Sequence, residues 1–570
     1  MTTRSTAITI GTLFLSLYLL TMSGHTVAPD EETTFAVTQS MVERWSLAVP
    51  PGSFMVAIPG SDGQYYSLYG LVPSVTSIPF YVLGRTVADD FAPRYQDIIE
   101  RFFVGLRDPI ITALTCVAVY IFATYLDYGR PISIALAAAF GAASIAWPYS
   151  KYEWTEASTS LWLLVATLTA FVSVQFARPK WSAVAGFALG LAIASKITTV
   201  VVVPIFAGYV AWEVVRRNVT AQQRRIAAAR FILFGTLLLV AILLLVAIPN
   251  QLRFGVFWET GYTRGVVGRD SFSLLNVEGM VGLLFSPGKS LFVYTPIAIL
   301  SCIGFATFAR RWPREAGLFA GLVVLHVMAN GAFNSENGGI AWHGDSAYGP
   351  RYLVPITALL TLPAGAVLAW GKPEFRPIYR KTFMALAVVG FLVQVGGVVT
   401  PYAYYNEVET GGTYGPLADQ RRWSPSASPV IHHWLIFVER VEDAVMSHAP
   451  AVTVRMGIID IHIDNNVSAL AVREALMPPL PVSDSQPWSA DARMWFWRPE
   501  GIVVDVWLWF LNYSGLPRSM LLLGLVPIVG MIVSLTVLLR GQAATADLLD
   551  THREVAYEIG IAEFRHRLSP

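Results

Sequence analysis

Cysteine and charge are scarce in this sequence, and both shortages limit what the protein can be. The 570 residues include only two cysteines, Cys116 and Cys302, and both fall inside apolar runs, so neither a disulfide framework nor a zinc knuckle is available. Charged residues make up 14% of the chain, where soluble domains carry about 25%. The net charge is +1, which leaves no positive excess for binding a nucleic acid. A soluble enzyme of this length is therefore excluded.

The abundant feature is apolar sequence, at 54% hydrophobic residues. It is gathered in uncharged runs such as 231–248 and 520–539, each about as long as a membrane's hydrocarbon core is thick. We predict an all-α polytopic membrane protein with about twelve spans. The predicted spans are 5–23, 109–126, 131–147, 159–177, 182–195, 197–214, 231–248, 290–309, 316–333, 352–370, 383–400 and 519–539.

Lys and Arg predict the orientation of these spans. With the N-terminus in the cytoplasm, the inner segments would hold clusters such as Arg216, Arg217, Arg224 and Arg225, as the positive-inside rule requires. The first span resembles a signal peptide, but it lacks a clear small-x-small cleavage site, and the next five turns require it as a span. We therefore expect a multi-pass protein of the cell membrane with a cytoplasmic tail at 540–570.

Most polar sequence would then lie outside the cytoplasm. A first outer loop of about 24–107 contains a short apolar stretch, 71–83, which is too short to cross a bilayer and is predicted to be interfacial or re-entrant. A second outer segment, 401–518, is rich in Trp and is expected to lie against the outer leaflet. The predicted units are a transmembrane module at 1–400, this segment, the last span at 519–539 and the tail.

Three consecutive carboxylates, Asp30, Glu31 and Glu32, stand where the chain leaves the first span. Acidic residues in a first turn complement the helix dipole, so the cluster predicts the start of a helix. A carboxylate mounted on a helix at a membrane surface could also act as a general base. The two interpretations are compatible, and the residue chemistry leaves both open.

Further polar residues collect at the other outer ends of the predicted spans. Gly and Pro beside them suggest shaped loops that approach a ligand closely, with Arg able to grip a phosphate. Alternatively, each could be an interface anchor, with Lys or Arg reaching toward the headgroups. These residues are Glu153, Glu156, Lys196, Tyr262, Arg264, Lys289, His343, Asp345 and Arg351.

The predicted span interiors carry almost no strongly polar side chains apart from His326, Asn330 and Gln394. Ion-coupled transporters need such groups near the midplane, so this class is disfavoured. His326 is expected to be a core histidine bonded to a backbone carbonyl. In the second outer segment, Asp460, His462 and Asp464 alternate as on one strand face, where a solvated face is favoured over a metal site.

Taken in order, these features resemble the GT-C class of membrane glycosyltransferases over about residues 1–400. The resemblance lies in the acidic pair Asp30-Glu31 after the first span, the GQYYSLY stretch at 63–69 before the interfacial segment, and the GFALGLAIASK run at 186–196. RFG, ETGY, LFSPGKSLF and YGPRYL are similar to a bacterial subgroup of the polyprenyl-phosphate-sugar-dependent, protein-mannosyltransferase-like branch. The sequence departs from the class in lacking Tyr-Pro-Pro-Leu and in carrying Glu in the second outer loop.

The resemblance implies sugar transfer outside the cytoplasmic membrane from a polyprenyl-phosphate sugar to a lipid, glycan or protein acceptor, usually with inversion. It implies Asp30 as general base with Glu31 beside it, and Arg351 on the phosphate with Lys196, Arg264 and Lys289 in reserve. Glu153, Glu156, His343 and Asp345 would contact the acceptor or sugar. The sequence names no cofactor, and a divalent metal is possible. The rival is a non-catalytic transporter or scaffold for lipid-linked glycans, which predicts a polar path through the spans.

Overall fold

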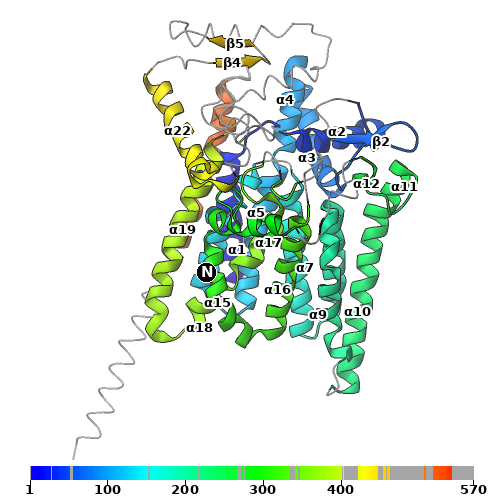
Figure 1. The fold of residues 1–570 in the computed structure, drawn as a ribbon, viewed down its shortest axis with the longest axis vertical. Helices are drawn as coiled ribbons and strands as arrows, with labels where there is room; N and C mark the ends of the chain where they lie inside the picture. The colour runs from blue at the N-terminus through cyan, green and yellow to red at the C-terminus, as the bar shows by residue number, and fades with distance from the viewer. Residues whose placement is uncertain are drawn as a thin grey trace, which may run out of the picture.

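The protein is a bundle of long helices with smaller helices and short strands at one end (Figure 1). Its structure is a computed structural model. The model describes residues 2–26, 28–51, 56–151, 154–215, 219–265, 273, 276–333, 341–344, 347–400, 402, 422–446, 453–456, 459–462, 506–508 and 518–541.

Eight helices in the described ranges are long and apolar enough to cross a membrane: Thr3–Thr21, Pro93–Tyr125, Thr155–Gln175, Ile197–Val214, Ala221–Phe254, Arg351–Trp370, Pro373–Val399 and Ser519–Gly541. The chain is therefore an all-α polytopic membrane protein, as predicted. Helices α6 (Arg130–Ala143) and α8 (Lys180–Ser195) are apolar but shorter, while α15 (Ile297–Arg311) and α16 (Pro313–Gly331) occupy two further predicted spans. A total of twelve spans stays a prediction.

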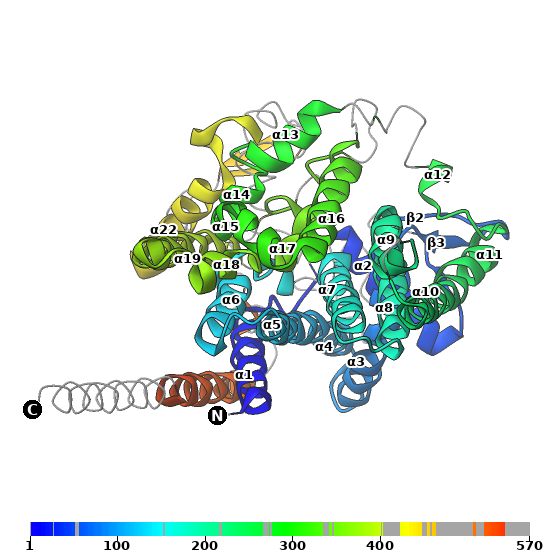
Figure 2. The same cartoon turned by 90° about the horizontal axis from the view of Figure 1, so that it is seen from below.

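The bundle is built from neighbouring helix pairs (Figure 2). Helix α1 (Thr3–Thr21) packs on α5 (Arg107–Tyr125), α5 on α6 and α7 (Thr155–Gln175), and α7 on α8. Three further helices lie beside them: α9 (Val203–Val215), α17 (Val354–Thr361) and α18 (Ala364–Trp370). Helix α19 (Arg376–Val399) packs on α6 and α15.

The glycines of the 186–196 run explain the tight contact between α8 and α10 (Ala221–Ile242). A Cβ on Gly186 would lie 2.1 Å from the carbonyl oxygen of Phe234, and one on Gly190 would lie 2.3 Å from Cβ of Ala241. Small residues four apart let two membrane helices approach closely. Most of this run therefore serves helix packing, and Lys196 at its end is the one residue of the run that remains a candidate for the active site. Helix α10 continues through a π-helical turn at Leu243–Ala247 into α11 (Ile248–Phe254).

Residues 24–107, predicted to be the first outer loop, form much of the layer of small helices and strands at that end of the bundle (Figure 1). They comprise α2 (Pro29–Arg44), α3 (Val72–Ala88), α4 (Pro93–Val104) and an antiparallel sheet of order β1-β3-β2, from Ala48–Val49, Tyr65–Ser67 and Ala57–Pro59. In the register, Ala48 faces Tyr66 and Ile58 also faces Tyr66. The stretch predicted to be a short apolar segment at 71–83 belongs to a 17-residue helix, α3, which tolerates Pro73 in its first turn and Pro79 in its interior.

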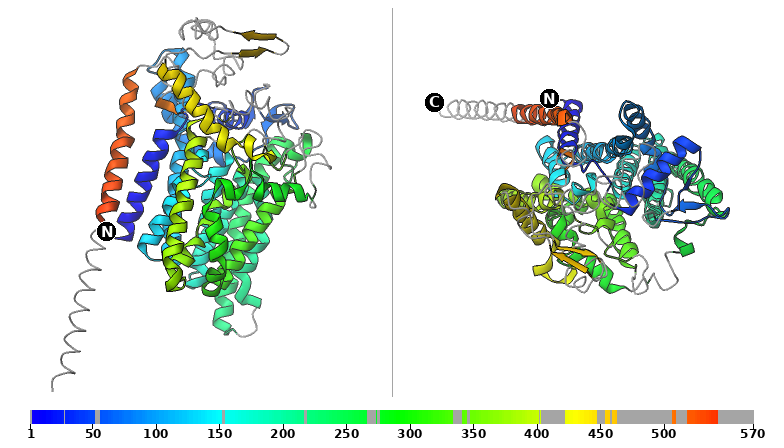
Figure 3. Two further views of the ribbon diagram at one scale, coloured as in Figure 1. Left: turned by 60° about the vertical axis from the view of Figure 1, so that its left-hand side comes forward. Right: turned by 90° about the horizontal axis from the view of Figure 1, so that it is seen from above.

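The described part of the second outer segment contains helix α22 (Pro429–Met446) and a hairpin of β4 (Thr453–Met456) and β5 (Ile459–His462). Asp460 and His462 fall on β5, whereas Asp464 lies outside the described residues. The last helix, Ser519–Gly541, runs beside α1 (Figure 3), and the Trp507 indole donates to the carbonyl oxygen of Leu19 at 2.6 Å. The predicted unit boundaries stay predictions.

The three polar side chains inside predicted spans are all bonded to backbone carbonyls. His326 Nδ1 lies 3.0 Å from the carbonyl oxygen of Leu322, as expected for a core histidine. Asn330 donates to the carbonyl oxygen of His326 at 2.8 Å, and Gln394 donates to that of Tyr294 at 2.8 Å. His326 and Asn330 thus bond within α16, whereas Gln394 of α19 bonds to Tyr294 of another helix.

Candidate active site

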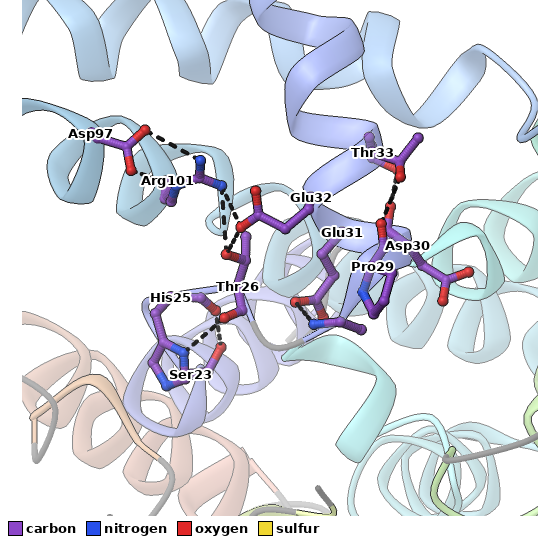
Figure 4. Close-up of polar contacts among 12 residues, drawn as sticks. Ser23, His25, Thr26, Pro29, Asp30, Glu31, Glu32, Thr33, Asp97 and Arg101 are labelled. Atoms are coloured by element: carbon purple, nitrogen blue, oxygen red, sulfur yellow. Dashed lines mark hydrogen bonds and ion pairs between the residues drawn. The ribbon is translucent and has the colours of Figure 1, made fainter. Parts of the chain in front are cut away.

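Helix α2 begins at the three consecutive carboxylates, as the sequence predicted, and their side chains point in different directions (Figure 4). Successive side chains in an α-helix are about 100° apart, so Asp30 and Glu32 project from nearly opposite faces. Glu31 Oε2 accepts from the backbone N–H of Ala28 at 3.2 Å and thereby caps the helix. Glu32 pairs with Arg101 of α4 at 2.7 Å. Glu31 and Glu32 are thus engaged in holding the helix start, which leaves Asp30 as the carboxylate directed elsewhere.

Asp30 faces a cation from the far half of the chain. Its Oδ1 atom lies 3.5 Å from Nη2 of Arg351, and its side chain is 20% exposed. Tyr69, just after strand β3, donates its hydroxyl hydrogen to the same carboxylate. Burial and the negative charge of Asp30 raise the pKa of Tyr69, so this hydroxyl stays protonated and can keep donating.

Arg351 is held by aromatic rings as well as by charge. Its guanidinium carbon lies 4.7 Å from the ring centre of Trp154 and 5.2 Å from that of Tyr352, as in cation–π contacts. Its Nε lies 3.6 Å from Oε1 of Glu156. Both carboxylate distances are longer than an ordinary hydrogen bond, and Nε is a buried donor with no hydrogen-bond partner among the described residues. Arg351 therefore retains donors for an incoming anion.

The glycines around Arg351 let the loop approach it. Gly344 has a φ of +69°, and a Cβ there would lie 2.9 Å from Cγ of Arg351. Gly349, which precedes Pro350, has a φ of +59°. Glycine can adopt this conformation, which brings the backbone against the ring of Tyr294, 2.6 Å from the position of a Cβ.

Glu156, in the first turn of α7, lies between the two cations of the site. Its Oε1 atom is 2.6 Å from Nζ of Lys196 and 3.6 Å from Nε of Arg351, and its side chain is 2% exposed. Lys196 follows the end of α8 and lies 4.4 Å from the ring centre of Tyr352. Two carboxylates and two cations thus alternate in the order Asp30, Arg351, Glu156, Lys196. We call these four residues the charge chain.

The other predicted site residues take different places. Burial and then the charge of Asp30 raise the pKa of Tyr262, so its hydroxyl stays protonated. Arg264 is exposed and donates to the carbonyl oxygen of Phe254 at 3.0 Å, whereas Lys289 is buried and donates to that of Ala347. His343 Nε2 lies 3.3 Å from Nη1 of Arg422. Glu153 and Asp345 lie outside the described residues.

Tyr69, Trp154 and Tyr352 contact the charge chain but were not predicted as site residues. Tyr69 closes the GQYYSLY stretch that carries the family resemblance, and this was an available signal. Trp154 and Tyr352 each neighbour a charged outer-loop residue, but aromatic residues at membrane interfaces are common. Composition alone cannot separate a cation-binding ring from such an anchor.

The carboxylates described at the site do not form an open pair for a divalent metal. Asp30 and Glu156 each lie beside a side-chain cation that supplies the positive charge a metal would bring. Within the described ranges, no group of three or more His, Cys, Asp or Glu residues is placed to hold a metal ion.

No protein-family model and no curated protein matches the chain. Among solved structures, it is similar to ArnT from Cupriavidus metallidurans bound to undecaprenyl phosphate, with 13% identity and a TM-score of 0.44 over 77% of this chain and 79% of that one. It is also similar to the oligosaccharyltransferase AglB from Archaeoglobus fulgidus in complex with an inhibitory peptide and a dolichol-phosphate. There the identity is 9% and the TM-score 0.40, over 73% of this chain and 58% of that one.

Proposed function

We propose that the protein transfers a sugar from a polyprenyl-phosphate-linked donor to an acceptor outside the cytoplasm. The observation that carries this proposal is the contact between Asp30 and Arg351 at the end of the helical bundle. There a partly exposed carboxylate lies 3.5 Å from a guanidinium whose Nε has no hydrogen-bond partner among the described residues. Glycosyl transfer from a phosphate needs both groups at one site, one for the acceptor's proton and one for the leaving phosphate. Inversion places these two groups on opposite sides of the anomeric carbon, so the contact between Asp30 and Arg351 opens when the sugar binds between them.

In the proposed reaction, Asp30 accepts the proton of the acceptor hydroxyl as its oxygen attacks the anomeric carbon of the sugar. A new bond forms between this oxygen and the anomeric carbon, and the bond from that carbon to the phosphate oxygen breaks. The phosphate leaves with the electron pair and remains on the polyprenyl carrier. Attack from the face opposite the phosphate inverts the anomeric centre.

Arg351 and Lys196 are the proposed phosphate ligands. A guanidinium can grip two phosphate oxygens, and a lysine adds a point charge. Glu156 lies next to both cations, and its side chain is 2% exposed. This burial suits it to holding the two cations in position rather than contacting the sugar. Tyr262, whose pKa is raised by burial and by the charge of Asp30, is a further candidate for contact with the substrate.

The rival function, a transporter or scaffold for lipid-linked glycans, has less support. It predicts polar side chains along a route through the spans. His326, Asn330 and Gln394 instead bond to backbone carbonyls of the helices. The charge chain lies at helix ends and not along such a route.

Mass spectrometry of a deletion strain tests the proposal. We expect a polyprenyl-phosphate sugar to accumulate, while a lipid, glycan or protein outside the cytoplasm lacks one sugar residue. Restoring the wild-type protein should reverse both changes. Unchanged pools of lipid-linked and cell-surface glycans would refute the proposal.

We also predict that the site faces away from the cytoplasm. Single cysteines at Ser61 and Ser424 should react with a membrane-impermeant thiol reagent in intact cells, whereas one at Ala221 should react only after lysis. Cys116 is buried, but Cys302 lies on the outer surface of α15, so a Cys302→Ser background is the control. Labelling at Ala221 but not at Ser61 would place the charge chain in the cytoplasm.

A further inference from the structure

The position of Asp30 depends on the rotation of the first turn of α2. Asp30 and Glu32 project to nearly opposite sides of one helical turn, so any rotation of this turn moves both. If Asp30 is the base, as proposed above, its position depends on what fixes the opposite side. Displacing a reacting group by about 1 Å can lower a rate by about 10²-fold.

Arg101 of α4 fixes that opposite side (Figure 4). Its Nη1 lies 2.7 Å from Oε1 of Glu32, and the same Glu32 oxygen accepts from the Thr26 hydroxyl. The guanidinium carbon also lies 4.0 Å from the ring centre of Phe35, one turn further along α2. Arg101 therefore contacts α2 at two points on successive turns, which restrains both the rotation and the tilt of its start.

Arg101 is itself held firmly. Its Nε and Nη2 donate to the two carboxylate oxygens of Asp97, at 2.9 and 3.2 Å, in the two-pronged geometry that guanidinium and carboxylate favour. Its side chain is 6% exposed and that of Glu32 is 3% exposed, so solvent screens their contact little. A buried pair of this kind is costly to break, because the remaining charge is left without compensation.

We propose that Arg101 is a positioning residue, which keeps Asp30 directed at Arg351 by holding Glu32 and Phe35 on the other side of α2. This inference rests on the proposed function of Asp30. It assigns Arg101 no contact with substrate. Loss of the contact between Arg101 and α2 should therefore slow turnover and leave the phosphate ligands, Arg351 and Lys196, in place.

The test removes each partner of the Arg101–Glu32 contact in turn, in the full-length protein. Arg101→Gln removes the cation, and Glu32→Ala removes the carboxylate while Arg101 keeps its pairing with Asp97. The second variant keeps the test valid if the first fails to fold. Arg85→Gln is the matched control, since Arg85 pairs with Glu43 near the other end of α2 at 2.6 Å but is 47% exposed. An exposed pair of this kind contributes little.

Three quantities are measured: binding of undecaprenyl phosphate, turnover of labelled undecaprenyl-phosphate sugars with the acceptor fraction of a deletion strain, and amide hydrogen exchange at 30–34. Arg101→Gln and Glu32→Ala should each lower turnover at least about tenfold with carrier affinity within about twofold of wild type. The double variant should be no slower than the slower single variant, because both cut one contact. Exchange at 30–34 should be faster in both single variants and unchanged in Arg85→Gln.

Wild-type turnover in either single variant, an equal loss of carrier affinity, additive losses in the double variant or unchanged exchange would each overturn the role of Arg101. Failure of the proposed function gives a different result. In that case wild-type protein transfers no sugar, or Asp30→Asn transfers it at the wild-type rate. The exchange measurement still reports whether Arg101 holds the start of α2.

Discussion

Asp30→Asn is expected to lower the rate of sugar transfer by about 10²- to 10⁴-fold, the usual loss when a general base is removed. Asparagine has nearly the same shape as aspartate, and its side-chain oxygen can still accept from Tyr69, whose hydroxyl donates to Asp30. The start of α2 is held by Glu31 and Glu32. Expression and thermal stability in detergent should therefore stay close to wild type. Initial rates at saturating donor measure the effect.

Glu31→Gln is the control for this variant, because it changes the adjacent carboxylate in the same way. A glutamine oxygen can still accept from the N–H of Ala28, so the helix cap should survive and turnover should change little. If Asp30→Asn retained full turnover while Glu31→Gln or Glu153→Gln were inactive, the base would be assigned to the wrong carboxylate.

Arg351→Lys is expected to weaken donor binding and slow turnover although the charge is conserved. Arginine lies against the rings of Trp154 and Tyr352 and offers a planar set of donors, whereas lysine supplies a point charge. Losing one charge-assisted hydrogen bond to phosphate costs about 1.5–3 kcal/mol, which is about a ten- to 150-fold change. Donor titration at fixed acceptor separates the change in affinity from the change in turnover.

Arg264→Lys provides the comparison for Arg351→Lys. Arg264 is exposed and donates to backbone carbonyl oxygens of Phe254 and Pro59, so its replacement should leave donor affinity near wild type. An arginine that only anchors a span to the headgroups would tolerate lysine equally well. Wild-type kinetics for Arg351→Lys would therefore remove Arg351 from the site.

The fold was predictable wherever one local property of the sequence, such as hydrophobicity or charge, determines the structure. Uncharged runs such as 231–248 must lie in lipid or in a core, and the structure places that run in a long apolar helix. The acidic residues after Pro29 predicted a helix start, and α2 begins there. His326 was predicted to bond to a backbone carbonyl, and it does.

The convergence of the site could not be predicted from the sequence. Charge asymmetry predicts which loops share a side of the membrane, but not which of their residues meet. Asp30, Glu156, Lys196 and Arg351 come from four distant segments, and only the packing of α2, α7 and α8 with the turn before α17 brings them together. Nothing in their local sequence distinguishes Lys196 from Lys289, which bonds to a backbone carbonyl instead.

Close packing also accounts for local details that sequence patterns miss. The positive φ of Gly349 depends on Tyr294, far away in sequence, and α3 continues past Pro79 although proline usually interrupts a helix. The role of Glu32 depends on Arg101, 69 residues further along the chain. Such pairings are properties of tertiary structure and have no local signature.

The most direct test of the central claim follows the sugar and the carrier separately. Purified protein is placed in liposomes that contain undecaprenyl phosphate bearing a labelled sugar, and the acceptor fraction of a deletion strain is added. The proposed function predicts that the label moves to the acceptor and that unlabelled undecaprenyl phosphate appears in equal amount, with Asp30→Asn supporting neither change. Movement of the intact labelled lipid across the bilayer, with the bond between sugar and phosphate unbroken, would contradict it.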